Sequence, residues 1–196
     1  MTDIVIRKGE SFSRVLRWES LPYVYTPITA ITKAAPAVVT AAGHGLVDGW
    51  RASIISAGGM RQINAKNFPP RATDFKKVTF VSSSQVNFND IDSSGYTTYT
   101  SGGYLMNYTP VSLASFTARM QIRATVSATT TLVSITNGAG ITLDDVNHTI
   151  TIALPATDTA AYTWTEGVYD LELASAGGVV TRLLEGNVTV LSEVTR

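Results

Sequence analysis

Alternation of apolar and polar residues is the feature that most limits how this chain can fold. In residues 116–123 the apolar side chains Ala118, Met120 and Ile122 alternate with polar ones. The same period of two recurs in three further segments, residues 150–154, 169–173 and 187–190. Successive side chains of a strand point to opposite faces, so the pattern is typical of antiparallel sheets that bury one face.

Turn-forming residues separate these strands at intervals of about 8 to 12 residues, the spacing of a β-sandwich. They are Asn137-Gly138, Asp144-Asp145, Asn147-His148, Glu166-Gly167, Gly177-Gly178 and Gly186-Asn187. Residues 3–7 and 12–18 flank a Gly9-Glu10 turn, which predicts an opening hairpin. The segment 156–162 after Pro155 is the one helical turn that we expect in this part of the chain.

A short phrase occurs twice, as Tyr25-Thr26-Pro27 and as Tyr108-Thr109-Pro110. The residues between the copies form short strands of their own, so we expect an insertion at a strand edge. The sequence predicts a discontinuous β-sandwich domain, residues 1–30 plus 105–196, interrupted by an inserted domain, residues 31–104.

The inserted domain has the pattern of a small β-barrel. About five short strands are expected, among them Ala37–Thr40, Arg51–Ser56, Lys77–Ser82 and Gln85–Phe88, with one helical turn in residues 62–68. Just before the insert, Pro22 and Pro27 remove hydrogen-bond donors, which confines their segment to an edge or a connection.

Composition limits the function. Fifteen basic and fifteen acidic residues give zero net charge, so we expect neither nucleic acid nor membrane as a partner. No cysteine is present, which excludes disulfides and thiolate chemistry. No apolar run approaches the ~18 residues of a membrane span, and the N-terminus lacks the apolar stretch of a signal peptide.

Motifs in the insert resemble the small β-barrel module of tailed-phage structural proteins, which is similar to the first catalytic-cysteine half-domain of ubiquitin-activating enzymes. The segments that carry this resemblance are residues 31–36, 43–46, 59–64 and 90–103. The resemblance implies a barrel without ubiquitin chemistry, since the chain has no cysteine and no nucleotide-binding motif.

The flanking halves resemble the immunoglobulin-like N-terminal module of phage baseplate upper proteins. This resemblance rests on residues 110–123, 169–173 and 182–190. It implies an all-β chain, an immunoglobulin-like antiparallel sandwich with an inserted small barrel. The split by the barrel favours a compact adaptor or decoration protein over a fibre-like or receptor-binding role.

Candidate catalytic and metal-binding residues are sparse. His44 lies between two glycines, and His148 falls in the other expected domain, so we expect turn roles for both. Asp90 and Asp92 lack the spacing of a calcium loop and fit Asx turns. The sequence therefore predicts no enzyme activity, no metal and no cofactor.

Two clusters are candidates for partner contact. One is aromatic and comprises Tyr96, Tyr99 and Tyr104, because tyrosine offers a large contact area with a polar tip. The other is basic and comprises Arg61, Lys66, Arg71, Lys76 and Lys77. Core packing of the barrel and a solvated face remain the alternative explanations.

We expect a non-enzymatic component of a tailed-phage virion, assembled in the host cytoplasm. The leading interpretation is an adaptor in the neck, tail or baseplate that docks in several copies, as a homo-oligomer, against other virion proteins. A capsid decoration protein and a carbohydrate- or host-surface-binding module are the alternatives.

Overall fold

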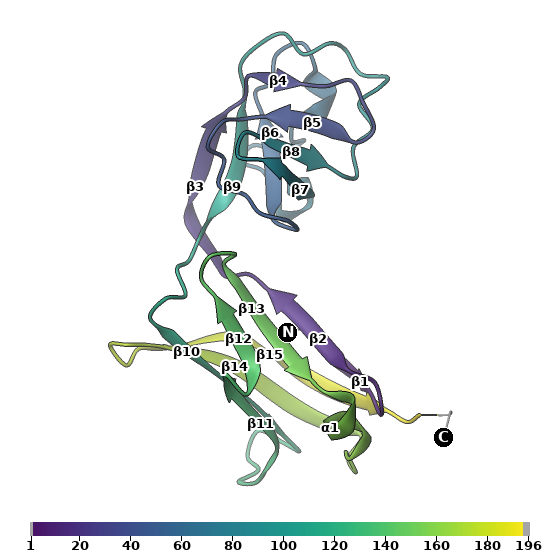
Figure 1. The fold of residues 1–196 in the computed structure, drawn as a ribbon, viewed down its shortest axis with the longest axis vertical. Helices are drawn as coiled ribbons and strands as arrows, with labels where there is room; N and C mark the ends of the chain where they lie inside the picture. Colours follow the sequence, from purple (N-terminus) through teal and green to yellow (C-terminus); the bar gives the residue numbers. More distant parts are fainter. Residues whose placement is uncertain (1, 194–196) are drawn as a thin grey trace. The chain divides into compact units, whose positions relative to one another are not determined.

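The computed structural model describes residues 2–193 and shows an all-β chain that divides into two compact units (Figure 1). The outer unit combines the residues up to Trp18 with those from Pro110 onward, and the inner unit comprises Glu19–Thr109. The inner unit thus extends beyond the expected 31–104 at both ends. The reason is that the strands on either side of that segment pair with each other inside the inner sheet.

The outer unit is an eight-stranded, sandwich-like sheet in the order β1-β15-β14-β10-β11-β12-β13-β2. Its elements are β1 (Ile4–Arg7), β2 (Phe12–Leu16), β10 (Phe116–Arg123), β11 (Thr131–Asn137), β12 (Gly140–Asp144), β13 (Thr149–Leu154), α1 (Ala156–Ala160), β14 (Glu166–Ser175) and β15 (Val180–Leu191). The helical turn after Pro155 is confirmed as α1. Strands β11 and β12 were not predicted. In β11 most apolar residues are only half-buried, so its sequence does not alternate between one buried and one exposed face.

The expected opening hairpin is wrong. Strand β1 pairs in parallel with β15, and β2 pairs antiparallel with β13, so the two lie at opposite ends of the strand order. Pairing with distant strands gives each a hydrogen-bonded ladder and also buries Ile4 and Ile6, which are 2% and 1% exposed. A local hairpin would supply the ladder without that burial.

The predicted alternation of the outer unit is confirmed by its core. Strand β10 pairs antiparallel with β14, with Met120 opposite Leu171 and Ile122 opposite Tyr169, and all four side chains are buried. The polar residues between them face solvent. One core therefore forms from residues that lie on both sides of the inserted unit in sequence.

The inner unit is a seven-stranded sheet in the order β3-β9-β6-β7-β8-β5-β4 that curls into a near-barrel. Its elements are β3 (Glu19–Pro27), β4 (Ala30–Ile31), β5 (Ala37–Thr40), β6 (Arg51–Ile55), η1 (Arg61–Ile63), η2 (Ala72–Asp74), β7 (Lys76–Ser82), β8 (Gln85–Phe88) and β9 (Tyr104–Pro110). The end strands β3 and β4 stand at opposite ends of this order, although only Ile28 and Thr29 separate them in sequence. The expected edge position of the two prolines in β3 is confirmed.

A separate core fills the barrel, with Trp50, Met60 and Phe88 among its largest buried side chains. Strand β9 contributes Leu105 to this core, whereas the next residue, Met106, packs on the opposite face of the sheet. The outer face of the barrel wall thus carries apolar residues of its own. In the described residues, no helix has the length and hydrophobicity needed to cross a membrane.

Candidate interaction face of the inner unit

The outer face of β9 and β6 is lined by residues at every second position. Met106 lies opposite Ser53, and Tyr104 lies opposite Ile55, so these four share one face. Continuing the antiparallel register by two residues places Tyr108 beside Arg51.

Neighbouring strands extend this row on both sides. On β7, Lys77 lies directly opposite Arg51. On β3, the ring of Tyr23 packs against that of Tyr108, with centroids 4.8 Å apart. A line of outward side chains therefore crosses four strands. The side chains on β3 and β9 are aromatic, and those on β6 and β7 are basic. We define the aromatic–basic face as Tyr23, Tyr25, Arg51, Lys77, Tyr104 and Tyr108.

The aromatic part of this face is held by ring contacts. The buried ring of Phe75 lies 5.0 Å from Tyr108 and 6.0 Å from Tyr23, and Tyr25 meets Tyr104 edge to face at 6.2 Å. The Tyr23 hydroxyl donates to the Tyr108 hydroxyl at 3.3 Å, and this bond raises the pKa of Tyr23 above its ordinary value. Tyr25 and Tyr104 stay 51% and 43% exposed, so two rings are open to a partner.

The basic part of the face is not neutralised within the unit. Arg51 and Lys77 are both exposed, and like charges directly opposite each other on paired strands are destabilising. Among residues 2–193, neither Arg51 nor Lys77 has a carboxylate within 4.0 Å. Such a pair gains stability from an anionic group outside the unit.

The expected tyrosine cluster is divided by the structure. Tyr96 and Tyr99 pack against the barrel core, and the Tyr99 hydroxyl donates to the carbonyls of Ile28 and Gly102 at 2.9 Å. Burial raises the pKa of Tyr99. Only Tyr104 joins the aromatic–basic face. Core packing is therefore the role that the structure shows for the first two tyrosines.

The five expected basic residues are all exposed but do not form one surface. Lys77 lies on the aromatic–basic face, and Lys76 falls on the opposite side of β7, where its ammonium donates to the Thr73 carbonyl at 3.0 Å. Lys66 and Arg71 belong to the loop that precedes β7. The remaining residue, Arg61, begins η1.

Sequence reasoning missed Tyr23, Tyr25, Tyr108 and Arg51. The spacing of the tyrosines by two in β3 and by four in β9 was the available signal, since it places each pair on one face of its strand. Arg51 had no such signal, because its neighbours on the face come from other strands.

The histidine and aspartate candidates have structural roles. The ring of His44 is buried, with Nε2 2.9 Å from the Ser82 carbonyl and Nδ1 accepting the Leu46 amide at 3.0 Å. Asp92 accepts hydrogen bonds from the amide and hydroxyl of Ser94, as an Asx turn does, and these bonds lower its pKa. No group of three or more possible metal ligands occurs in the part of the chain that the structure describes.

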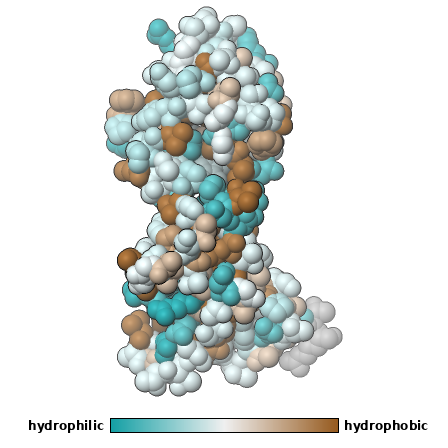
Figure 2. Space-filling view, turned by 60° about the vertical axis from the view of Figure 1, so that its left-hand side comes forward, coloured by the Kyte–Doolittle hydropathy of each residue, from teal (hydrophilic) through white to brown (hydrophobic). Residues whose placement is uncertain are grey.

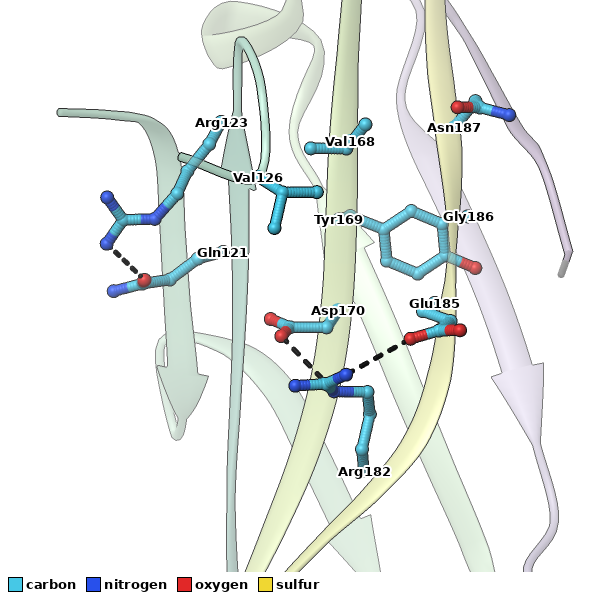
Figure 3. Close-up of a pocket in the computed structure, with 10 residues that line it drawn as sticks. All are labelled: Gln121, Arg123, Val126, Val168, Tyr169, Asp170, Arg182, Glu185, Gly186 and Asn187. Carbon is cyan, nitrogen blue, oxygen red and sulfur yellow. Dashed lines mark hydrogen bonds and ion pairs between the residues drawn. The ribbon is translucent and has the colours of Figure 1, made fainter. Parts of the chain in front are cut away.

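The outer unit carries a shallow hollow of about 440 Å³ over β10, β14 and β15 (Figure 3). Its residues are Gln121, Arg123, Val126, Val168, Tyr169, Asp170, Arg182, Glu185, Gly186 and Asn187. The Arg182 guanidinium pairs with Asp170 at 3.5 Å and with Glu185 at 3.2 Å. Both carboxylates of this hollow are thus already paired with Arg182, and the Arg123 guanidinium donates to the Ala128 and Thr129 carbonyls. The hollow therefore has less to offer a charged partner than the aromatic–basic face.

Apolar residues occur in small groups among polar ones over the visible surface in Figure 2. Scattered apolar residues of this kind are normal on a protein surface and do not by themselves mark an interface. In comparisons with known proteins, no protein-family model and no curated protein matches this chain.

Proposed function

We propose that this chain is a non-enzymatic structural component of a tailed-phage particle. It acts as an adaptor in the neck, tail or baseplate, docks in several copies and connects to neighbouring tail or fibre proteins. In this proposal the outer unit is an immunoglobulin-like sandwich, and the inner unit is a small barrel of the kind found in phage structural proteins.

The nesting of one β unit inside the other is the observation that carries this proposal. The Val111 amide donates to the Trp18 carbonyl at 3.0 Å, so the chain leaves and re-enters the outer unit at one place. Trp18 also packs edge to face on Phe116 at 5.3 Å. Because each unit has its own core, one chain carries two separately folded surfaces, which suits a protein that bridges two neighbours.

The chemistry of the candidate residues supports a binding role over catalysis. A general base must reach a substrate proton, whereas the buried His44 has both ring nitrogens within hydrogen-bonding distance of backbone groups. The aromatic–basic face instead combines tyrosine and arginine, two residue types that are enriched in protein interfaces.

Location of the chain in a reconstruction of the particle that contains it tests the proposal. We expect density for both units at the portal-to-tail axis or in the baseplate, in copies related by the symmetry of that structure. Density on the capsid lattice would instead identify a decoration protein. Specific binding on a glycan array that is lost when Tyr25 and Tyr104 are replaced would identify a carbohydrate-binding module.

A further inference from the structure

The loop between η1 and β7 exposes the most accessible aromatic side chain of the inner unit. Phe68 is 85% exposed, well above the exposure of Tyr25 or Tyr104. It is flanked by Lys66 and Arg71, whose side chains are also exposed. We call residues 64–75 the Phe68 loop. A single exposed apolar residue is common on protein surfaces, so a binding role is inferred from the order of this loop and from its charge.

The Phe68 loop is ordered by hydrogen bonds to one carboxylate. Asp74 accepts the Lys66 amide at 3.3 Å, the Arg71 amide at 2.9 Å and the Asn67 side-chain amide at 2.9 Å. The bond from the Arg71 backbone is the main cause of the lowered pKa of Asp74, and the Asn67 bond adds to it. Asp74 therefore stays ionised, and its hydrogen bonds stabilise the loop.

Packing fixes both ends of the same loop. The Ala65 amide donates to the Ile54 carbonyl at 2.7 Å, and Phe75 is buried against Tyr23 and Tyr108. The loop is thus fixed to β6 at Ala65 and to the aromatic–basic face at Phe75, and Phe68 is exposed between these two points. Because little backbone freedom remains, a partner that binds Phe68 need not order the loop first.

The charge around the loop defines the partner. Six of the seven Lys and Arg residues of the inner unit fall in residues 51–77, where Asp74 is the single acidic residue. Arg51 and Lys77 lie opposite each other without a carboxylate within 4.0 Å among the described residues. Complementarity therefore calls for an acidic surface.

We propose that the Phe68 loop is a preformed docking element for an acidic protein surface. The ring of Phe68 enters an apolar pocket of that partner, while Lys66 and Arg71 of the same loop meet carboxylates at its rim. An aromatic anchor surrounded by charged contacts is the usual form of an interface hot spot. The identification of the partner as another virion protein rests on the proposed adaptor function.

A lipid surface fits these observations less well. Even a single myristoyl chain gives only marginal membrane binding, and one phenylalanine buries less apolar surface than that chain does. Backbone addition is also disfavoured at the nearby edge strand, since Pro22 and Pro27 of β3 lack amide donors. Side-chain docking by the loop remains the favoured mode.

Two synthetic peptides test the proposal with the purified full chain. The first peptide has two central leucines, which can contact the ring of Phe68, flanked on both sides by glutamates. The second peptide is identical except that each glutamate is replaced by glutamine. We expect the acidic peptide to bind more tightly, and the difference to shrink as salt rises, because screening weakens exposed charge pairs. Fluorescence anisotropy of labelled peptides gives both affinities.

Variants locate the binding surface. Phe68→Ala should lower the affinity for the acidic peptide by roughly tenfold or more, as truncation of a hot-spot residue does. Replacing Lys66 and Arg71 together by glutamate should remove the preference for the acidic peptide. Val126→Ala and Lys33→Glu are matched controls for an exposed apolar side chain and a lysine elsewhere, and both should bind as the wild type does. Unchanged tryptophan fluorescence confirms that each variant is folded.

Three results would overturn the proposal. They are equal affinity for both peptides, a Phe68→Ala variant that binds as well as the controls, and Phe68-dependent binding to vesicles of anionic lipid that exceeds binding to the acidic peptide. Phe68-dependent self-association in analytical ultracentrifugation would reassign the loop to contacts between copies of this chain and also refute it. None of these results depends on where the chain lies in a particle, so they are separate from the test of the adaptor function.

Discussion

Excision of the whole inner unit should leave a folded outer unit. The change removes residues 19–109 and joins Trp18 to Pro110 through two glycines. Every strand pair of the outer sheet is formed by strands that remain, and the Trp18–Val111 hydrogen bond shows that the two ends already lie close together. The narrower excision of residues 31–104, suggested by the sequence, would leave β3 and β9 with their aromatic residues uncovered.

The size of the effect follows from loop closure. With the inner unit folded, its paired strands β3 and β9 hold the ends of the insert together, so excision should change the free energy of unfolding of the outer unit by less than about 1 kcal/mol. With the inner unit unfolded, the outer unit must close a flexible loop of about 90 residues. At ~0.6 kcal/mol per doubling from a few residues, that closure costs about 3 kcal/mol.

Urea titration of three proteins measures these values. They are the wild type, the excised protein and a Val39→Asp variant, which places an unpaired charge in the fully buried barrel core. Trp18 and Trp164 lie in the outer unit and Trp50 lies in the inner unit. Tryptophan fluorescence therefore follows the outer unit alone when Trp50 is replaced by phenylalanine, and the inner unit alone when Trp18 and Trp164 are replaced instead.

We expect the free energy of unfolding of the outer unit to be nearly equal in the wild type and the excised protein. In the Val39→Asp variant it should be about 3 kcal/mol lower. A disordered circular dichroism spectrum for the excised protein would refute the separation into independently folded units. So would an excised protein that is less stable than the Val39→Asp variant, because the outer fold would then depend on contacts with the inner one.

Three further substitutions separate the units and test the loop. Leu171→Ala should destabilise the outer unit by about 2 to 5 kcal/mol and leave the Trp50 transition unchanged, since the leucine is fully buried in the outer core. Gly59→Ala should abolish or greatly weaken the Trp50 transition alone, because φ is +75° and a Cβ would lie 2.2 Å from the Thr98 carbonyl. The folded-state pKa of Asp74 lies below the unfolded value of about 4, so its stabilisation is complete above that pH and is lost as pH falls through the folded pKa. Asp74→Asn should therefore make the urea midpoint of the inner unit less sensitive to acid below about pH 4, and an unchanged sensitivity would show that this carboxylate does not stabilise the loop.

The candidate site shows which signals are local and which are not. Lys66, Arg71 and Lys77 could be named from the sequence because they lie close together in it. Tyr96 and Tyr99 were misplaced because proximity in sequence does not tell a core-facing ring from an outward one within irregular backbone. Sequence reasoning could not group Tyr23, Tyr108 and Arg51, because they meet only through pairing of β3, β9 and β6.

The sequence by itself determined that the chain is all-β, where most strands and turns fall, and that a second β unit interrupts the first. Period-two alternation depends on local backbone geometry and burial, so it can be read without knowing any partner strand. Only the tertiary structure decided that β1 and β2 join opposite ends of one sheet, that β3 and β9 belong to the barrel, and how the aromatic–basic face is composed. Those outcomes depend on competition among distant strands for pairing and burial, which no short segment encodes.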